Sequence, residues 1–152
     1  MVDVREDILA RLAEVLATIP NINAVYRNNV DIPETDLPAA ILLDGDEETT
    51  DSTDKSMRPP NRPTMVTMTP GIIVQVQDDN VVLGSIITTF RQELIKRVLI
   101  DSELNQLAGT GRLGNGAIRY LGCQTDVGWT RTGFAALTAQ FLFKYPLIPN
   151  DL

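Results

Sequence analysis

The side chains that most often perform catalysis or bind metals are scarce in this sequence. It contains no histidine, which removes both the commonest general base and the commonest metal ligand. Its one cysteine, Cys123, can form neither a disulfide within the chain nor a cysteine-based zinc site. Cys123 lies at an alternating strand position beside apolar residues, so we expect a small buried hydrophobe and not a nucleophile. We expect no metal, no cofactor and a reducing compartment such as a cytoplasm.

Two other patterns resemble catalytic or binding motifs but occur in the wrong context. Residues 109–114 match the string G-x-G-x-x-G, whose backbone amides bind a pyrophosphate at the start of a helix in dinucleotide-binding proteins. Here a helix is expected before the string and a strand after it, so the string predicts a flexible loop. The adjacent carboxylates Asp78 and Asp79 suit a helix cap better than acid and base catalysis. The sequence therefore predicts a protein that is not an enzyme.

The acidic side chains are concentrated in residues 44–54. The whole chain has a net charge of −7, and this segment holds six acids and no base, which leaves −1 for the remainder. Because like charges repel, we expect a solvated, extended loop. The segment lacks the glycine that a calcium-binding EF-hand has at its sixth position, so Ca²⁺ is not expected. Lys and Arg are too scattered for a nucleic-acid-binding patch. The six acids are Asp44, Asp46, Glu47, Glu48, Asp51 and Asp54.

The single tryptophan lies in a polar segment between two expected strands. Trp129 is close to Arg131, and an aromatic residue beside an arginine at a hairpin tip is typical of the residues that anchor protein interfaces. The alternative is that the large indole folds back over its own sheet. Trp129 and Arg131 are thus candidate interface residues.

Apolar periodicity predicts where the helices and strands lie. Spacings of three and four residues predict helices over 3–19 and 83–98, with a further helical turn over 102–107. Alternation and short apolar runs predict strands, and proline indicates a stiff spacer at 58–63. The expected strands are 24–27, 39–43, 64–77, 118–127 and 135–145.

This order of elements, α-β-β-β-α-β-β, predicts an α+β fold. We expect an antiparallel sheet of four or slightly more strands with two helices on one face. The 152 residues suit a single domain over 1–152, in which the acidic loop 44–54 and the spacer 58–63 form an insertion between strands. No apolar run reaches the about 18 residues of a membrane helix, and the acidic start differs from a signal peptide. We expect a soluble, unexported protein.

Four segments of the chain resemble the tail terminator proteins, also called tail completion proteins, of long-tailed bacteriophages and prophages. The likeness extends over almost the whole length and lies in the order of the elements and in the general character of their sequences. It includes two apolar helices, a strand that leads into acids, and a long closing hairpin. The four segments are DILARLAEVLATIPNINAVYRN, LPAAILLDGDEE, GSIITTFRQELIKRVL and YLGCQTDVGWTRTGFAALTAQFLFKY.

This resemblance implies a structural role in the virion, at the junction of head and tail. Members of the family are small α+β domains that form a ring, usually of six, at the head-proximal end of the tail tube. The ring stops tube polymerisation and offers a surface to the head connector, and the genome passes through its channel. The implied partners are other copies of the chain, the major tail tube protein and the head connector or stopper protein. The family provides no contact residue that can be transferred to a position here.

Two hypotheses about individual residues follow from this resemblance, and three other functions are open. The six acids are expected to face the channel or the adjoining ring, where their charge would keep DNA from sticking. Trp129 and Arg131 are expected to contact another subunit or the tube. The alternative functions are another phage neck component, such as a head completion or stopper protein, a small non-catalytic binding domain of the bacterial host, and a carboxylate-dependent hydrolase.

Overall fold

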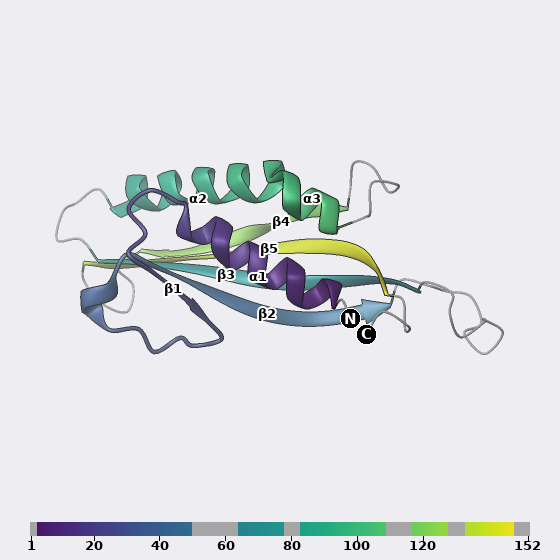
Figure 1. Ribbon diagram of the computed structural model, residues 1–152. Helices are drawn as coiled ribbons and strands as arrows, with labels where there is room; N and C mark the ends of the chain where they lie inside the picture. The colour runs from purple at the N-terminus through teal and green to yellow at the C-terminus, as the bar shows by residue number, and fades with distance from the viewer. Residues whose placement is uncertain (1–2, 50–63, 78–82, 109–116, 128–132, 148–152) are drawn as a thin grey trace.

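The computed structural model describes residues 3–49, 64–77, 83–108, 117–127 and 133–147, and these residues form a mixed α+β fold (Figure 1). The described part contains one sheet of five strands, three α-helices and one short 3-10 helix. Sequence analysis predicted the succession of the main elements correctly but counted the last helix only as a turn. In chain order the elements are α1 (Val4–Ala17), β1 (Ala24–Arg27), η1 (Glu34–Asp36), β2 (Ala39–Thr49), β3 (Thr64–Gln77), α2 (Leu83–Ile100), α3 (Ser102–Leu107), β4 (Ile118–Val127) and β5 (Phe134–Leu147).

The strand order in the sheet is β1-β2-β3-β5-β4, and all neighbours are antiparallel except β1 and β2. The prediction of a wholly antiparallel sheet is therefore wrong for β1. A parallel pair needs a connection that returns to the starting edge, and residues 28–38 provide it. The Tyr26 hydroxyl donates a hydrogen bond to Asp36, which ties this connection to β1. Figure 1 shows the connection on the opposite side of the sheet from α2.

The α-helices cover one face of the sheet and enclose the hydrophobic core. The predicted stripe of α1 is confirmed, because Ile8, Leu12, Val15 and Leu16 are all buried. The expected inward positions of α2 and β5 are buried as well, because strict periods of 3.6 and 2 keep one side of each element facing the core. These residues are Leu83, Ile87, Phe90, Leu94 and Val98 of α2, and Leu137, Ala139, Phe141, Phe143 and Tyr145 of β5.

Polar contacts fix the helix ends. The Asp3 carboxylate caps α1 by accepting from the backbone N–H of Arg5, while the Glu6 side chain binds Arg27. Asp101 caps α3 by accepting from the N–H of Leu104 at 3.0 Å. The same carboxylate accepts from Arg11 of α1 at 2.7 Å, so this contact joins the first helix to the third.

Candidate functional site

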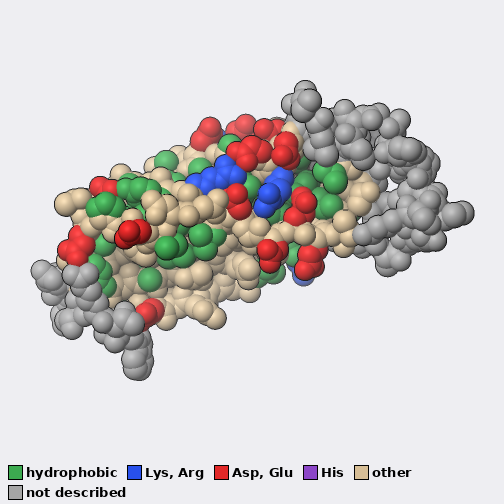
Figure 2. Space-filling model, turned by 90° about the horizontal axis from the view of Figure 1, so that it is seen from below, with side chains coloured by type: hydrophobic (Ala, Val, Ile, Leu, Met, Phe, Trp, Pro, Cys, Tyr) green, Lys and Arg blue, Asp and Glu red, His purple; other side chains and the backbone are tan. Residues whose placement is uncertain are grey.

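The face of the sheet that lies opposite the helices is partly bare, and we consider it the candidate functional surface. Along β3 and β5, residues facing the helices are buried, and those between them are half-buried or exposed. Figure 2 shows this side of the molecule. Acidic side chains surround a small group of Lys and Arg, and the rest of the described surface is mostly apolar or uncharged. The bare face consists of Thr67, Thr69, Gly71, Ile73 and Gln75 of β3, Ala136, Thr138, Gln140, Leu142 and Lys144 of β5, and Arg119, Leu121, Gln124 and Asp126 of β4.

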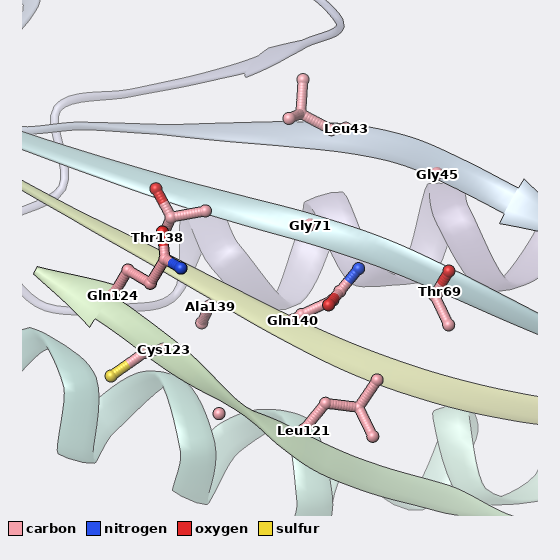
Figure 3. Close-up of a pocket in the computed structure, with 11 residues that line it drawn as sticks. Leu43, Gly45, Thr69, Gly71, Leu121, Cys123, Gln124, Thr138, Ala139 and Gln140 are labelled. Carbon is pink, nitrogen blue, oxygen red and sulfur yellow. The ribbon is translucent and has the colours of Figure 1, made fainter.

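A shallow groove of about 500 Å³ crosses the bare face (Figure 3). It is hollow because glycines from three strands, Gly45, Gly71 and Gly122, contribute no side chain to its lining. The polar side chains in it are uncharged amides and hydroxyls, which donate and accept hydrogen bonds but transfer no proton at neutral pH. Such a groove suits contact with another surface better than acid or base chemistry. The polar lining residues are Thr69, Gln124, Thr138 and Gln140.

Cys123 belongs to the lining of the groove, and its sulfur is on the helix side of the sheet (Figure 3). It is half-buried and not fully buried as expected. Its backbone pairs with buried Ala139, and its side chain packs against the core. A β-bulge between Tyr120 and Gly122 separates its orientation from that of Leu121, which lines the groove. Strict alternation along the predicted strand 118–127 would put Leu121 and Cys123 on one side, and the bulge puts them on opposite sides.

The acidic run is a strand over its first six residues, so the predicted loop 44–54 is wrong for residues 44–49. β2 continues to Thr49 and pairs with β3 beyond a register shift between Leu43 and Asp46. Gly45 lies in this shift with a φ of +75°. Residues 50–63, which include Asp51, Asp54 and the proline-rich spacer, lie outside the described residues. Trp129 and Arg131 lie outside them as well.

Strand geometry divides the four described acids between the two faces. Glu47 pairs with Met68, which faces the helices, and it accepts a hydrogen bond from the hydroxyl of buried Tyr145. Asp46 and Glu48 are exposed and pair with Thr69 and Thr67 on the bare face. Of the four described acids, Asp46 and Glu48 thus lie on the bare face, and Glu47 lies on the helix side.

Asp44 is the fourth described acid, and it belongs to an ion cluster that joins β2, β1 and α1. The Arg27 guanidinium donates to Asp44 at 2.8 Å and to Glu6 at 2.7 Å. These hydrogen bonds hold the pKa of both carboxyls below its ordinary value. Arg5 adds a hydrogen bond to the carbonyl of Gly45 at 3.2 Å. Sequence reasoning missed the role of Arg27, because its partners are 17 and 21 residues away.

The ion pairs predict acid sensitivity. Hydrogen bonds from Arg27 lower the pKa of Glu6 and Asp44, and one from Arg11 lowers that of Asp101. The folded state therefore binds fewer protons than the unfolded state, whose carboxyls titrate near about pH 4. The resulting stability is present above that pH and is lost as the pH falls through the lowered values. We expect the Tm, followed by circular dichroism at fixed salt, to fall from about pH 5 to about pH 3.

The matched variant for this measurement is Arg27→Gln, which removes the cause of two of the three shifts. Its Tm should be lower than that of the wild type at neutral pH and should fall less steeply with acid. An equally steep fall in both proteins would contradict the assignment of this stability to Arg27.

Among the described residues, no group of three or more Asp, Glu, Cys or His side chains is arranged to hold a metal ion. Within the same part of the chain, no helix combines the length and apolar character needed to span a membrane.

Comparison with known proteins gives a likeness to solved structures and no match to a family. The chain matches no protein family model and no curated protein. A solved structure of the virion of a native gene transfer agent (GTA) particle contains a similar chain, with a TM-score of 0.42 and 12% sequence identity. The match covers 94% of this chain and 92% of that chain. The TM-score and the sequence identity are both too low to assign a shared function.

Proposed function

We propose that this chain is a structural protein of a phage-like virion that forms a ring, expected to be a hexamer, at the head-proximal end of the tail tube. The ring stops polymerisation of the major tail tube protein and offers an attachment surface to the head connector. The likeness of four segments to tail terminators, over almost the whole length, supports this proposal. An assembly role of this kind requires complementary surfaces and no reactive group.

The observation that carries the proposal is the bare face of the sheet. Helices cover the other face, and a sheet of this kind commonly leaves its second face to water or to a partner. Here that face holds a hydrogen-bonding groove and includes Leu121, whose side chain is 47% exposed. In a ring with the helices outside, the bare face would line the channel.

The composition of the bare face suits the passage of DNA. A protein binds the phosphate backbone through clustered Lys and Arg, and each such contact adds affinity independent of sequence. The described bare face is rich in threonine and glutamine and carries two bases, Arg119 and Lys144. Acids on the same face, which include Asp46, Glu48 and Asp126, balance these bases. The genome would slide past such a surface without sequence-specific binding.

The channel hypothesis for the acids narrows accordingly. Among the described acids it now concerns Asp46 and Glu48, because Asp44 and Glu47 are bound by Arg27 and Tyr145 on the helix side. For Asp51 and Asp54, which lie outside the described residues, it stays a prediction. A contact of Trp129 and Arg131 with another subunit or with the tube stays a prediction.

Capping of tail tubes is the direct test. Tube protein from the same phage or prophage is allowed to polymerise with and without the purified chain, and tube lengths are measured by electron microscopy. We expect added protein to halt elongation and to appear as extra density at one end of each tube. Elongation at an unchanged rate would reject the terminator role. Binding to the head connector without any effect on tubes would favour a head completion or stopper protein.

A further inference from the structure

The sheet has two unlike edges, and they are suited to join one copy of the chain to the next. One edge is β4, which pairs only with β5 among the described residues. The other edge is formed by β1 where it covers Ala39–Leu42 of β2, and by β2 itself beyond Leu42. We call the change from β1 to β2 along this edge the step. Beyond this step the outer side of β2 carries Asp44, whose N–H is bound by Asn28, and then the acidic residues 46–48.

The direction of the strands allows the sheet to continue from copy to copy. Each step from β2 to β3, β5 and β4 is antiparallel, so β4 runs opposite to β2. Copies related by rotation about a ring axis keep their strand directions. The β4 edge of one copy therefore meets β2 of the next copy in antiparallel orientation, with the helices of both copies on the same side.

Charges of opposite sign lie at the same level on these two edges. Asp46 pairs with Thr69, and the register Met68 to Phe143 makes Leu142 the next residue in that row. Leu142 pairs with Arg119, which is exposed at the β4 edge. For strands that run along the ring axis, a row across the sheet stays at one height, so that row brings Arg119 of one copy to Asp46 of the next. The adjacent row on the same face consists of Glu48, Thr67 and Lys144.

Two features of β4 support pairing along its first residues. Natural edge strands are commonly blocked by lysine, proline or a β-bulge, and residues 118–120 of β4, which precede the bulge, have none of these. The β-bulge between Tyr120 and Gly122 interrupts regular pairing. Gly122 is in the row of Gln140, Gly71 and Leu43, immediately before the residues that β1 covers. The regular part of β4 thus ends where the step of the neighbouring copy begins.

We propose that residues 117–119, at the start of β4, in one copy pair with residues 46–48 of β2 in the next copy, with Arg119 and Lys144 facing Asp46 and Glu48. This head-to-tail contact continues the sheet from copy to copy through an antiparallel pair and covers the acidic end of β2. It also explains why acids occupy the end of a strand where β-branched or aromatic residues would be expected. The inference rests on the proposed ring and names the surface through which its copies bind one another.

A charge exchange tests the contact. Arg119→Glu alone, and Asp46→Lys with Glu48→Lys, should each weaken self-assembly by about tenfold or more, because like charges then face one another. The triple variant restores opposite charges and should regain most of the lost affinity. Assembly is measured by sedimentation velocity over a range of protein concentrations and by the occurrence of rings on tail tubes.

The matched control is Lys96→Glu, which makes the same change in net charge as Arg119→Glu at an exposed position on α2. It should assemble like the wild type. Wild-type rings that tolerate every reversal, or a triple variant no better than the single changes, would overturn the contact and leave the terminator role intact. A wild-type protein that forms no ring, even on tubes, would reject the proposed function and with it the contact.

To separate loss of contact from loss of folding, Arg119→Cys and Asp46→Cys proteins, both with Cys123→Ser, are mixed and oxidised. We expect a disulfide that links one protein of the first variant to one of the second, at a higher yield than either variant gives alone. Equal yields in the mixture and in the separate proteins would contradict the head-to-tail arrangement.

Discussion

Replacing Gly45 with alanine is expected to reduce the free energy of unfolding by about 3 kcal/mol or more. Gly45 has a φ of +75°, which residues with a side chain rarely adopt. A Cβ atom there would lie 2.0 Å from the carbonyl oxygen of Thr69 and 2.6 Å from its carbon. Both atoms belong to the backbone of the central strand, so the clash cannot be relieved by turning a side chain. Urea denaturation followed by circular dichroism measures the effect.

Two other glycines separate the clash from the backbone conformation. Gly122 has a φ of +124° but open space around it, so Gly122→Ala should cost about 1–2 kcal/mol. Gly84 lies in the first turn of α2, also in open space, and Gly84→Ala should stabilise the protein by about 0.5 kcal/mol. The test is the order of the three variants in lost unfolding free energy, which should be largest for Gly45→Ala, smaller for Gly122→Ala and absent for Gly84→Ala. A Gly45→Ala protein as stable as Gly84→Ala would show that the bulge in β2 is not formed.

The elements that sequence reasoning located well are those whose burial follows one period. The stripe of α1 and the alternation of β5 both depend on a single face against a single core, so neighbours in the sequence predict it. The strand at residues 39–43 was also predicted, from a short apolar run. Its continuation to Thr49 was not, because charge density indicates a loop when only local sequence is considered.

The extension of β2 to Thr49 depends on contacts with residues that are distant in the sequence. Asp44 is stabilised by Arg27 of β1, and Glu47 by Tyr145 of β5, which is 98 residues away. Tertiary partners of this kind override local propensity in strands more than in helices. The parallel pairing of β1 was missed for a related reason. A four-residue strand carries too little periodicity to fix its direction, and the connection that fixes it is irregular.

The candidate surface was missed for a further reason, which is that sequence reasoning looked for reactive or charged side chains. Glycine, threonine and glutamine line the groove, and only the strand register brings Gly71 and Gly122 into one row with Gln140. The two faces of the sheet consequently have different roles in our proposal. The helix face stabilises the fold, and the bare face and its edges bind other molecules.

This division of roles predicts opposite outcomes for two truncations on neighbouring strands. Phe141 is fully buried on the helix face and packs against Tyr120, with ring centroids 5.5 Å apart. Phe141→Ala removes this contact and leaves a cavity, so it should cost about 3–5 kcal/mol of unfolding free energy. Leu121 is on the other face and is 47% exposed, so Leu121→Ala should cost less than about 1 kcal/mol.

Assembly should respond to Leu121→Ala more than unfolding does. Leu121 is exposed on the bare face, two residues beyond the β4 segment that we propose pairs with the next copy, so its truncation should weaken ring formation although the protein stays folded. Phe141→Ala should impair assembly only at temperatures or urea concentrations at which it unfolds. The same two measurements, urea denaturation and sedimentation velocity, are made on both variants. Equal losses of folding stability would place Leu121 in the core, and wild-type assembly by Leu121→Ala would exclude it from the contact between copies.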